Sequence, residues 1–341
     1  MEVMNPKESA KLITSQSEDV KILPDGIVSI SHELIKIMKK DKSVMNFKGW
    51  KKHPLNPSVA DNQAIDWIFL VDALNFSFWT PTNGEKYKVN YRAHSYTGYW
   101  SLCAAVNRAL DEGVPITSAE YFCNITETQA KKVFRSDSST DMPMLKERVQ
   151  VMNEIGQVLL EKFNGSFSQC ISDAKGSAQA LLKIIVDNFP CYRDHHDYGA
   201  QRVSFYKRAQ ILIADLWACF EGRSDGAFYD INCITMFADY RIPQALVYFK
   251  VISYSERLMR LLEADHMFQC GDSLEMEIRG VSIQAVELIK DKMRQLLSMD
   301  HELSGTPMNA ILIDHYLWDY RRQHDQQTRI IPFHKVRCIY Y

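Results

Sequence analysis

A chain of 341 residues is long enough to bury a sizeable core without disulfides or metal ions. Its 46% hydrophobic and 24% charged residues exclude the composition of a disordered chain. The 40 basic and 42 acidic residues nearly cancel, giving a net charge of -2. This balance argues against the broad positive surface that binds long nucleic acids or anionic membranes.

The cysteines and the apolar runs of the sequence indicate the cellular compartment in which the protein is expected. The eight cysteines are scattered singly, without a CxxC pair or zinc-like spacing, so we expect buried thiols, as suits a reducing cytoplasm. Residues 1–21 lack the apolar stretch of a secretory signal, and the richest apolar runs are broken by Asp72 or Asp215. The sequence therefore predicts a cytoplasmic protein without a membrane segment.

Apolar periodicity predicts helices along most of the chain. Residues 30–40 have helical spacing, whereas the apolar stretch 64–80 fits either a strand or a buried helix. Residues 86–94 alternate as in a short strand or hairpin arm. Further helices are expected at 100–113, 118–122, 145–163, 177–189, 204–222, 243–265, 282–297 and 307–323.

These elements predict a mainly α fold with a small mixed α/β elaboration in the N-terminal third. No internal repeat, low-complexity tract or long linker marks a clean boundary in the sequence. We therefore expect one compact body over residues 1–341, with only a weak internal split into 1–140 and 141–341.

Motifs of the common enzyme classes are absent from the sequence. It contains no GxxxxGK[ST] phosphate loop, no GxGxxG, no GxSxG elbow and no HExxH. His195 and His196 are adjacent, so they do not normally converge on one metal ion, and no ligand lies at a suitable spacing. We expect them in a loop or at a helix start, with Asp194 or Asp197 as the cap. The sequence predicts no metal and no cofactor.

The segment 235–249, TMFADYRIPQALVYF, places Asp239 at a turn that leads into a helix. Free backbone N–H groups at a helix start favour a charged carboxylate and orient it. A fixed carboxylate can stabilise positive charge that develops during a reaction. The alternative is that Asp239 only caps the helix or pairs with Arg241.

The motifs FADYRIPQ, FYKRAQILIADLW and LIDHYLWDYRR together resemble the queuosine-salvage family, over essentially the whole chain. The resemblance implies a fold similar to the helix-hairpin-helix DNA glycosylases. It also implies a hydrolase that cleaves the N-glycosidic bond of queuosine 5′-monophosphate and releases queuine for salvage into tRNA modification. The implied partner is a small nucleotide, with no long nucleic acid and no membrane.

The implied reaction gives Asp239 a catalytic role. Cleavage of a ribosyl C1′–N bond passes through an oxocarbenium-like centre. Queuine is a 7-deazapurine, in which carbon replaces the ring nitrogen that usually accepts the departing proton. More of the barrier must then be lowered on the sugar side, with Asp239 as electrostatic stabiliser, nucleophile or orienter of water. The sequence leaves these three roles open.

The last predicted helix carries the candidates for base recognition. Asp314 and Trp318 are four residues apart and share a face, whereas Asp319 is rotated away. A carboxylate can accept the neighbouring N–H donors of a guanine-like edge, and an aromatic ring can stack on a base. The alternative is an amphipathic helix with Trp318 in the core and Asp314 paired to an arginine, Arg321 or Arg322. Asp319 is expected to pair with an arginine or to contact the queuine side ring.

Two cations begin the helix predicted at 204–222. Lys207 is the candidate for binding the 5′-phosphate, and an ordinary solvated lysine is the alternative. Arg208 falls on the next face, toward Asp215, and is expected to pair locally.

Three further residues are candidate ligand contacts. If the chain is extended before Asp239, Phe237 projects to the same side and can stack on the base, although core packing explains it equally well. His53 and Asn75 are polar groups beside apolar runs that could donate hydrogen bonds to the ligand. Capping or satisfying the core is at least as common for such residues.

Two other classes of function are compatible with the sequence. A DNA or RNA repair-type glycosylase could use the same architecture, although the near-zero net charge argues against it. A non-catalytic helical adaptor would bind a nucleotide without cleaving it. The sequence does not reveal the oligomeric state or whether the unphosphorylated nucleoside is a substrate. It also does not distinguish direct attack by water from a covalent intermediate.

Overall fold

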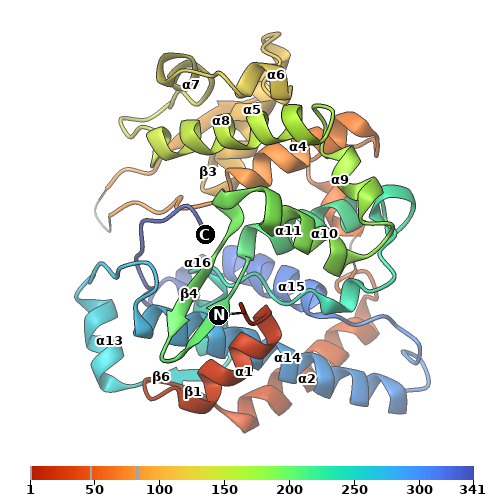
Figure 1. Cartoon of the computed structure of the whole chain (residues 1–341). Helices are drawn as coiled ribbons and strands as arrows, with labels where there is room; N and C mark the ends of the chain where they lie inside the picture. The colour runs from red at the N-terminus through yellow and green to blue at the C-terminus, as the bar shows by residue number, and fades with distance from the viewer. Residues whose placement is uncertain (1, 47, 82–83) are drawn as a thin grey trace. The chain divides into compact units, whose positions relative to one another are not determined.

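Helices dominate the structure, a computed structural model that describes residues 2–46, 48–81 and 84–341 (Figure 1). The strands are short and pair as two-stranded antiparallel ribbons. The predicted mainly α fold is confirmed. In the described part of the chain, every helix is too short or too polar to cross a bilayer.

The chain divides into two compact units, each assembled from separate segments. Unit 1 consists of Met1–Gly49, Asp194–Lys207 and Asn232–Arg337, and unit 2 of Trp50–Arg193, Arg208–Ile231 and Cys338–Tyr341. Residue 140, where the sequence pattern favoured a weak internal split, lies inside unit 2.

Unit 1 is built mainly of helices. They are α1 (Pro6–Gln16), α2 (Pro24–Lys40), α12 (Ile242–Tyr248), α13 (Glu256–Glu263), α14 (Ser273–Met299), α15 (Ala310–Gln323) and α16 (Asp325–Thr328). Two ribbons accompany them, β1 (Val20–Ile22) with β6 (Ile252–Tyr254) and β4 (His195–Tyr198) with β5 (Gln201–Ser204). The short helix α3 (Lys48–Lys52) and a 3-10 turn at Ile231–Cys233 lie where the chain passes from one unit to the other.

Helix α14 forms the core of unit 1. It is buried along much of its length, and both α1 and α2 pack against it (Figure 1). At Gly280 the helix comes so close to α1 that an added Cβ would lie 2.8 Å from Ile13. The helix predicted from residue 282 is confirmed, but it begins earlier, at Ser273. The added stretch includes Glu275 and Arg279, both buried.

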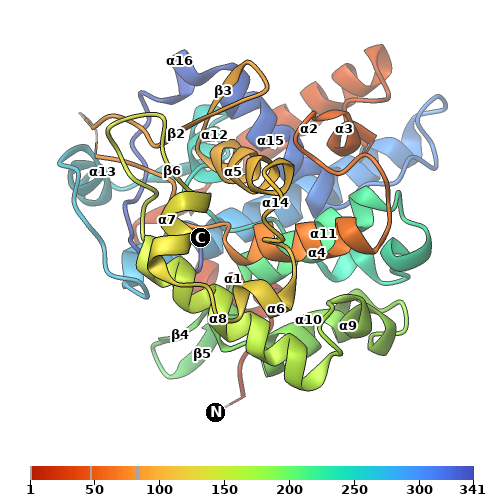
Figure 2. The same cartoon turned by 90° about the horizontal axis from the view of Figure 1, so that it is seen from above.

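Unit 2 is also mainly helical. Its helices are α4 (Asn62–Ala73), α5 (Tyr99–Asp111), α6 (Ala119–Phe122), α7 (Glu127–Val133), α8 (Leu145–Lys162), α9 (Ser168–Asp173), α10 (Ala178–Asn188) and, from Arg208 onward, α11 (Lys207–Cys219). The hairpin predicted around 86–94 is present as β2 (Lys88–Tyr91) and β3 (His94–Thr97). Short 3-10 turns lie at Pro190–Tyr192 and Ser224–Gly226. Helices α6 and α7 both pack on α8 (Figure 2).

The ambiguous apolar stretch 64–80 is a buried helix followed by irregular chain. Asp61 caps α4, because its Oδ1 accepts a hydrogen bond from the N–H of Ala64 at 2.9 Å. Every residue from 67 to 73 is buried. A helix that is covered on all sides needs no polar face, so its sequence does not show the amphipathic period.

Two fully buried arginines hold the chain that leaves α4. Arg148 and Arg208 donate hydrogen bonds to carbonyl oxygens within residues 73–76, which have no partner inside the helix. Their guanidinium groups also lie 4.2 and 5.3 Å from the ring centre of Phe76. The local pairing of Arg208 toward Asp215 is therefore replaced by bonds to main-chain carbonyls.

The eight cysteines are all free thiols. Six are buried, as the sequence predicted, and Cys233 and Cys270 are half-buried.

The stretch 243–265, predicted as a single helix, is two helices separated by a strand. Helix α12 ends at Tyr248, and Lys250 takes a left-handed conformation with a φ of 54°. Strand β6 follows and pairs with β1. Ser255 then starts α13 by accepting a hydrogen bond from the N–H of Leu258 at 3.1 Å. The prediction of a single helix is wrong. The three-residue strand β6 is too short to interrupt the helical spacing of apolar residues that the prediction relied on.

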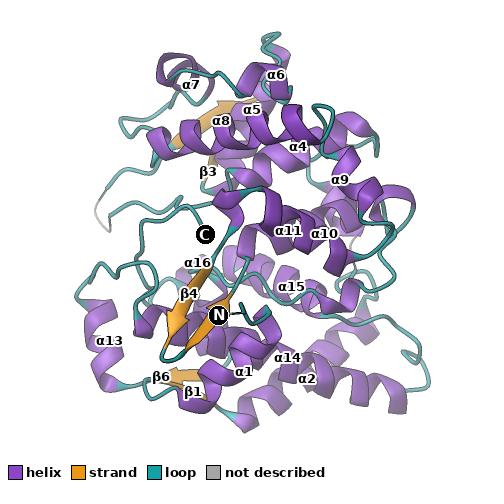
Figure 3. Cartoon of the chain, viewed as in Figure 1, coloured by secondary structure: helices purple, strands orange, loops and turns teal. Residues whose placement is uncertain are grey.

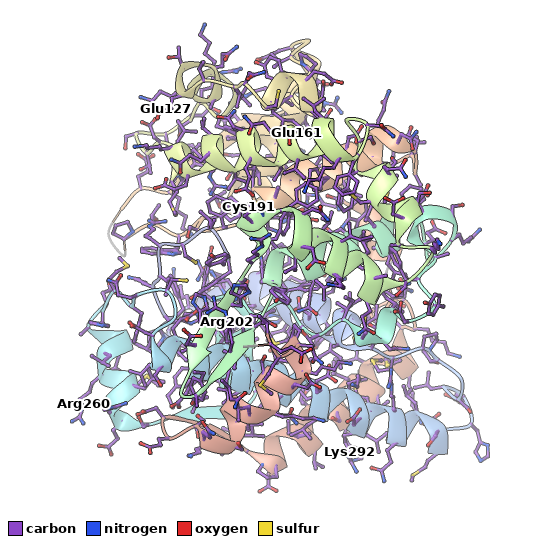
Figure 4. All side chains as sticks on the ribbon, in the orientation of Figure 1. Glu127, Glu161, Cys191, Arg202, Arg260 and Lys292 are labelled. Carbon is purple, nitrogen blue, oxygen red and sulfur yellow. The ribbon has the colours of Figure 1, made fainter. Side chains whose placement is uncertain are left out.

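His195 and His196 begin strand β4, so their expected place in a loop or helix start is wrong. Strands β4 and β5 form a hairpin, drawn in orange in Figure 3, with Gly199 at its turn. Arg202 on β5, labelled in Figure 4, pairs with Asp197 on β4 at 3.1 Å.

Gly26, in the first turn of α2, tests the close packing in unit 1. An added Cβ would overlap the carbonyl oxygen of Lys250, so Gly26→Ala must displace the helix or the backbone before β6. We expect a lower Tm in thermal unfolding, because overpacking costs about 1–3 kcal/mol. Gly49→Ala, where an added Cβ meets nothing within 4 Å, is the control and should not lower Tm. An unchanged Tm for Gly26→Ala would contradict this packing.

Candidate active site

Asp239 lies in the loop that leads into α12. Its Oδ1 accepts hydrogen bonds from the N–H groups of Arg241 at 2.7 Å and Ile242 at 2.9 Å. The side chain is half-buried, and among the described residues no hydrogen bond reaches Oδ2. The guanidinium of Arg241 binds Gln244 at 3.1 Å instead of pairing with Asp239. The cap considered as an alternative therefore exists, but it uses only one carboxylate oxygen.

The chain before Asp239 makes a tight turn. The N–H of Asp239 donates to the carbonyl oxygen of Phe237 at 2.7 Å. The extended geometry that would place both side chains on one side is therefore wrong. Phe237 is 3% exposed, and its ring centre lies 6.1 Å from that of His315. Residues 237–239 form a feature that we call the Asp239 turn.

Asp314 of α15 binds the Asp239 turn directly. Its Oδ2 accepts the hydrogen bond from the N–H of Phe237 at 2.9 Å, and its side chain is buried. The alternative partner Arg321 pairs with Asp325 at 2.8 Å instead. The structure thus brings Asp314, Phe237 and Asp239 together.

Trp318 and Asp319 lie further along α15, which confirms the predicted helix. Trp318 is half-buried rather than enclosed in the core, and the guanidinium carbon of Arg322 lies 4.8 Å from its ring centre. Asp319 is exposed, and its charge partly offsets the lowering of the pKa of Arg322 that burial causes. A role for Asp319 in ligand binding stays a prediction.

Lys207 is the first residue of α11 and belongs to unit 1 with Asp239. Its side chain is only 5% exposed, which excludes the ordinary solvated lysine. Its backbone N–H donates to Oδ2 of Asp194 at 3.3 Å.

His53 and Asn75 belong to unit 2, whereas the other predicted site residues belong to unit 1. The Nδ1 of His53 accepts a hydrogen bond from the N–H of Leu55 at 3.3 Å, and its ring stacks on Trp100 with centres 3.4 Å apart. The amide of Asn75 donates to Oδ1 of Asp72 at 3.4 Å. Both residues therefore have local structural partners, as expected for residues that cap a turn or satisfy polar groups in the core.

A buried ionic cluster contacts the Asp239 turn. Arg279 of α14 is fully buried and donates to the two carboxylate oxygens of Asp194 at 3.0 and 2.6 Å. It also donates to Oε1 of Glu275 at 3.1 Å. Its Nε donates to the carbonyl oxygen of Ala238 at 2.9 Å. The cluster therefore reaches the residue that precedes Asp239.

The carboxylate of Asp194 is held in its charged form. Burial alone would raise its pKa, but the charge of Arg279, together with His196 at 3.7 Å from Oδ1, outweighs burial and holds the pKa well below the ordinary value. Sequence analysis missed the cluster because the predicted helix began only at 282. The spacing of Glu275 and Arg279, four residues apart among apolar residues, is the signal that could have revealed it.

The residues around the Asp239 turn provide one carboxylate in a fixed orientation. Oδ1 of Asp239 is held by two N–H donors, so Oδ2 has a defined direction and can stabilise or attack a positive centre. Within the described ranges, no group of three or more His, Cys, Asp and Glu side chains is arranged to hold a metal ion.

Known proteins are similar in sequence to this chain over its full length. Residues 55–341 match the family model described as queuosine salvage protein. The chain is 47% identical to the queuosine 5′-phosphate N-glycosylase/hydrolase of Mus musculus, over 99% of both chains. Proteins of the same name from Nematostella vectensis and Schizosaccharomyces pombe are 43% and 37% identical, over 100% and 98% of this chain and 99% of theirs.

Asp314→Leu tests the link between α15 and the Asp239 turn. It leaves the buried N–H of Phe237 without its acceptor, which costs about 1–3 kcal/mol. We expect a lower Tm and faster hydrogen exchange of the Phe237 amide. Asp314→Asn keeps an acceptor oxygen and should lose less, and Asp319→Leu on the exposed face is the control. Unchanged exchange at Phe237 in Asp314→Leu would show that this hydrogen bond does not hold the turn.

Proposed function

Because this chain belongs to the queuosine salvage protein family, we propose that it hydrolyses the N-glycosidic bond of queuosine 5′-phosphate with Asp239 as the catalytic carboxylate. The chain is an enzyme that cleaves N-glycosyl bonds, and its substrate is a small nucleotide. The reaction is inferred from the full-length similarity to relatives that are named for this activity. The choice of Asp239 as the catalytic residue is supported by the asymmetry of its carboxylate. Oδ1 accepts two hydrogen bonds, whereas Oδ2 accepts none among the described residues.

In the proposed reaction the C1′–N bond breaks and its electron pair leaves with the base. Positive charge develops on the ribosyl C1′, next to Oδ2 of Asp239. The oxygen of one water molecule bonds to C1′, and a water proton ends on the departing nitrogen, giving queuine and ribose 5-phosphate. Because the 7-deaza ring lacks the usual proton acceptor, the barrier is lowered mainly by the carboxylate.

The proposed base site lies along α15. Trp318 is half-buried, so a ring face can stack on the base, and Asp314 is anchored to the Asp239 turn at the same helix. Phe237 completes this group from the turn itself. Asp319, His53 and Asn75 are secondary candidates, because each is exposed or already has a local partner.

Asp239→Asn tests the catalytic assignment. The amide oxygen can still accept from Arg241 and Ile242, so the fold and Tm should stay close to those of the wild type. We expect kcat for queuine release to fall by at least about 100-fold, in the range for loss of one electrostatic stabiliser. Asp25→Asn, which changes an exposed carboxylate in the first turn of α2, is the control. Wild-type kcat in Asp239→Asn, measured by mass spectrometry of free queuine, would refute the assignment.

Lys207→Met tests the proposed phosphate contact. The change keeps the length and apolar stem of the side chain and removes its charge. We expect KM for queuosine 5′-phosphate to rise about 10- to 100-fold, as for loss of a charged hydrogen bond of about 1.5–3 kcal/mol. Turnover of the unphosphorylated nucleoside, if measurable, should not change, and Lys11→Met on the exposed face of α1 is the control. An equal loss with both substrates would contradict a phosphate contact.

A further inference from the structure

The geometry points to Arg279 as a positioning residue for the hydrolysis, which fixes the Asp239 turn through the carbonyl group of Ala238. This inference rests on the proposed catalytic role of Asp239. Arg279 is fully buried, and its guanidinium binds Asp194, Glu275 and the Ala238 carbonyl, so we assign it a role through the turn rather than on the substrate. Its Nε–H donates to the Ala238 oxygen at 2.9 Å, and this oxygen belongs to the peptide group that carries the Asp239 nitrogen.

The Asp239 turn is held at several of its main-chain groups. The N–H of Phe237 is bound by Asp314, and its carbonyl oxygen accepts from Asp239. The next carbonyl, that of Ala238, is bound by Arg279. The carboxylate Oδ1 is bound at the start of α12. Release of the Ala238 carbonyl would let this peptide rotate and change the direction of Oδ2, and misplacement by about 1 Å can cost 100-fold in rate.

Arg279 is itself rigid. Its two terminal nitrogens bind the two oxygens of Asp194 as a fork, and its guanidinium carbon lies 4.1 Å from the ring centre of Phe205. Asp194 also accepts the backbone N–H of Lys207, the proposed phosphate residue. One guanidinium is therefore linked through Asp194 to the backbone of Lys207 as well as to the Asp239 turn.

Only arginine satisfies these contacts at once. The Nε–H points to the Ala238 carbonyl while the fork binds Asp194, and both directions are fixed by the planar group. A lysine has one nitrogen and cannot reach both. Buried ion pairs are weak sources of stability compared with well-packed apolar side chains. The geometric requirement at Ala238 gives this costly group a function.

Arg279→Lys is the direct test. The variant keeps a positive charge near Asp194 and Glu275 but loses the Nε–H bond to Ala238. We expect kcat for queuosine 5′-phosphate to fall about 10- to 100-fold with little change in KM, because Asp194, which binds the backbone of Lys207, is retained and the base contacts are untouched. Arg294→Lys is the matched control on the same helix. The Nε of Arg294 also donates to a carbonyl oxygen, that of Met308, at 2.9 Å, and its loss should leave kcat unchanged.

A double variant separates positioning from a general structural effect. If Arg279 acts through Asp239, then Arg279→Lys should cause no further loss in an Asp239→Asn background, measured in single turnover with excess enzyme. Losses that multiply would overturn the inference, as would wild-type kcat in a folded Arg279→Lys enzyme. If Arg279→Lys does not fold, Asp194→Asn, which weakens the fork but keeps its shape, takes its place with the same expected and opposing outcomes for kcat. Its KM is not a readout, because Asp194 also binds the backbone of Lys207.

The two proposals fail in different ways. Wild-type kcat in Asp239→Asn would refute the catalytic role of Asp239, whatever Arg279→Lys does. A large loss in Asp239→Asn combined with wild-type kcat in Arg279→Lys would refute the positioning role alone.

Discussion

The packing of unit 1 around the Asp239 turn depends on the hydrogen bonds and ion pairs of the Arg279 guanidinium. Left without partners, a buried charge of this kind would cost several kcal/mol, so Arg279 is tolerated only when its carboxylate partners are in place. Those partners come from α14 itself and from the residue before the β4 hairpin, and the Nε–H donates to the carbonyl oxygen of Ala238 in the Asp239 turn. Three segments that are distant in the sequence must therefore assemble together around one side chain.

This arrangement suits the hydrolysis of a nucleotide. A carboxylate that stabilises a developing cation is effective when it does not have to reorient during the reaction. Here one oxygen of Asp239 is bound to the main chain, and the peptide before it is bound from the core. The near-zero net charge of the chain agrees with a substrate that carries a single phosphate rather than a polymer backbone.

The sequence predicts the local features well and the long-range ones poorly. Apolar periodicity located most helices, and the turn at Asp239 followed from a polar residue before a proline-containing helix start. The strand β6 was missed because it exists only through its pairing with β1. The cluster around Arg279 was missed because the predicted helix began at 282, which left out the spacing of Glu275 and Arg279, and because Asp194 meets Arg279 only after folding. The base and phosphate contacts rest on family resemblance for the same reason.

The interleaved make-up of the two units has a consequence for biosynthesis. Unit 1 needs residues up to Arg337 before its last segment is available, and unit 2 needs residues 338–341. Within unit 2 the carbonyl oxygen of Tyr341 accepts the N–H of Ser77 at 2.9 Å, which joins an early segment to a late one. Because synthesis runs from the N-terminus, neither unit can close until these later segments have been made. Until then the apolar faces of the earlier segments lack the later segments that cover them.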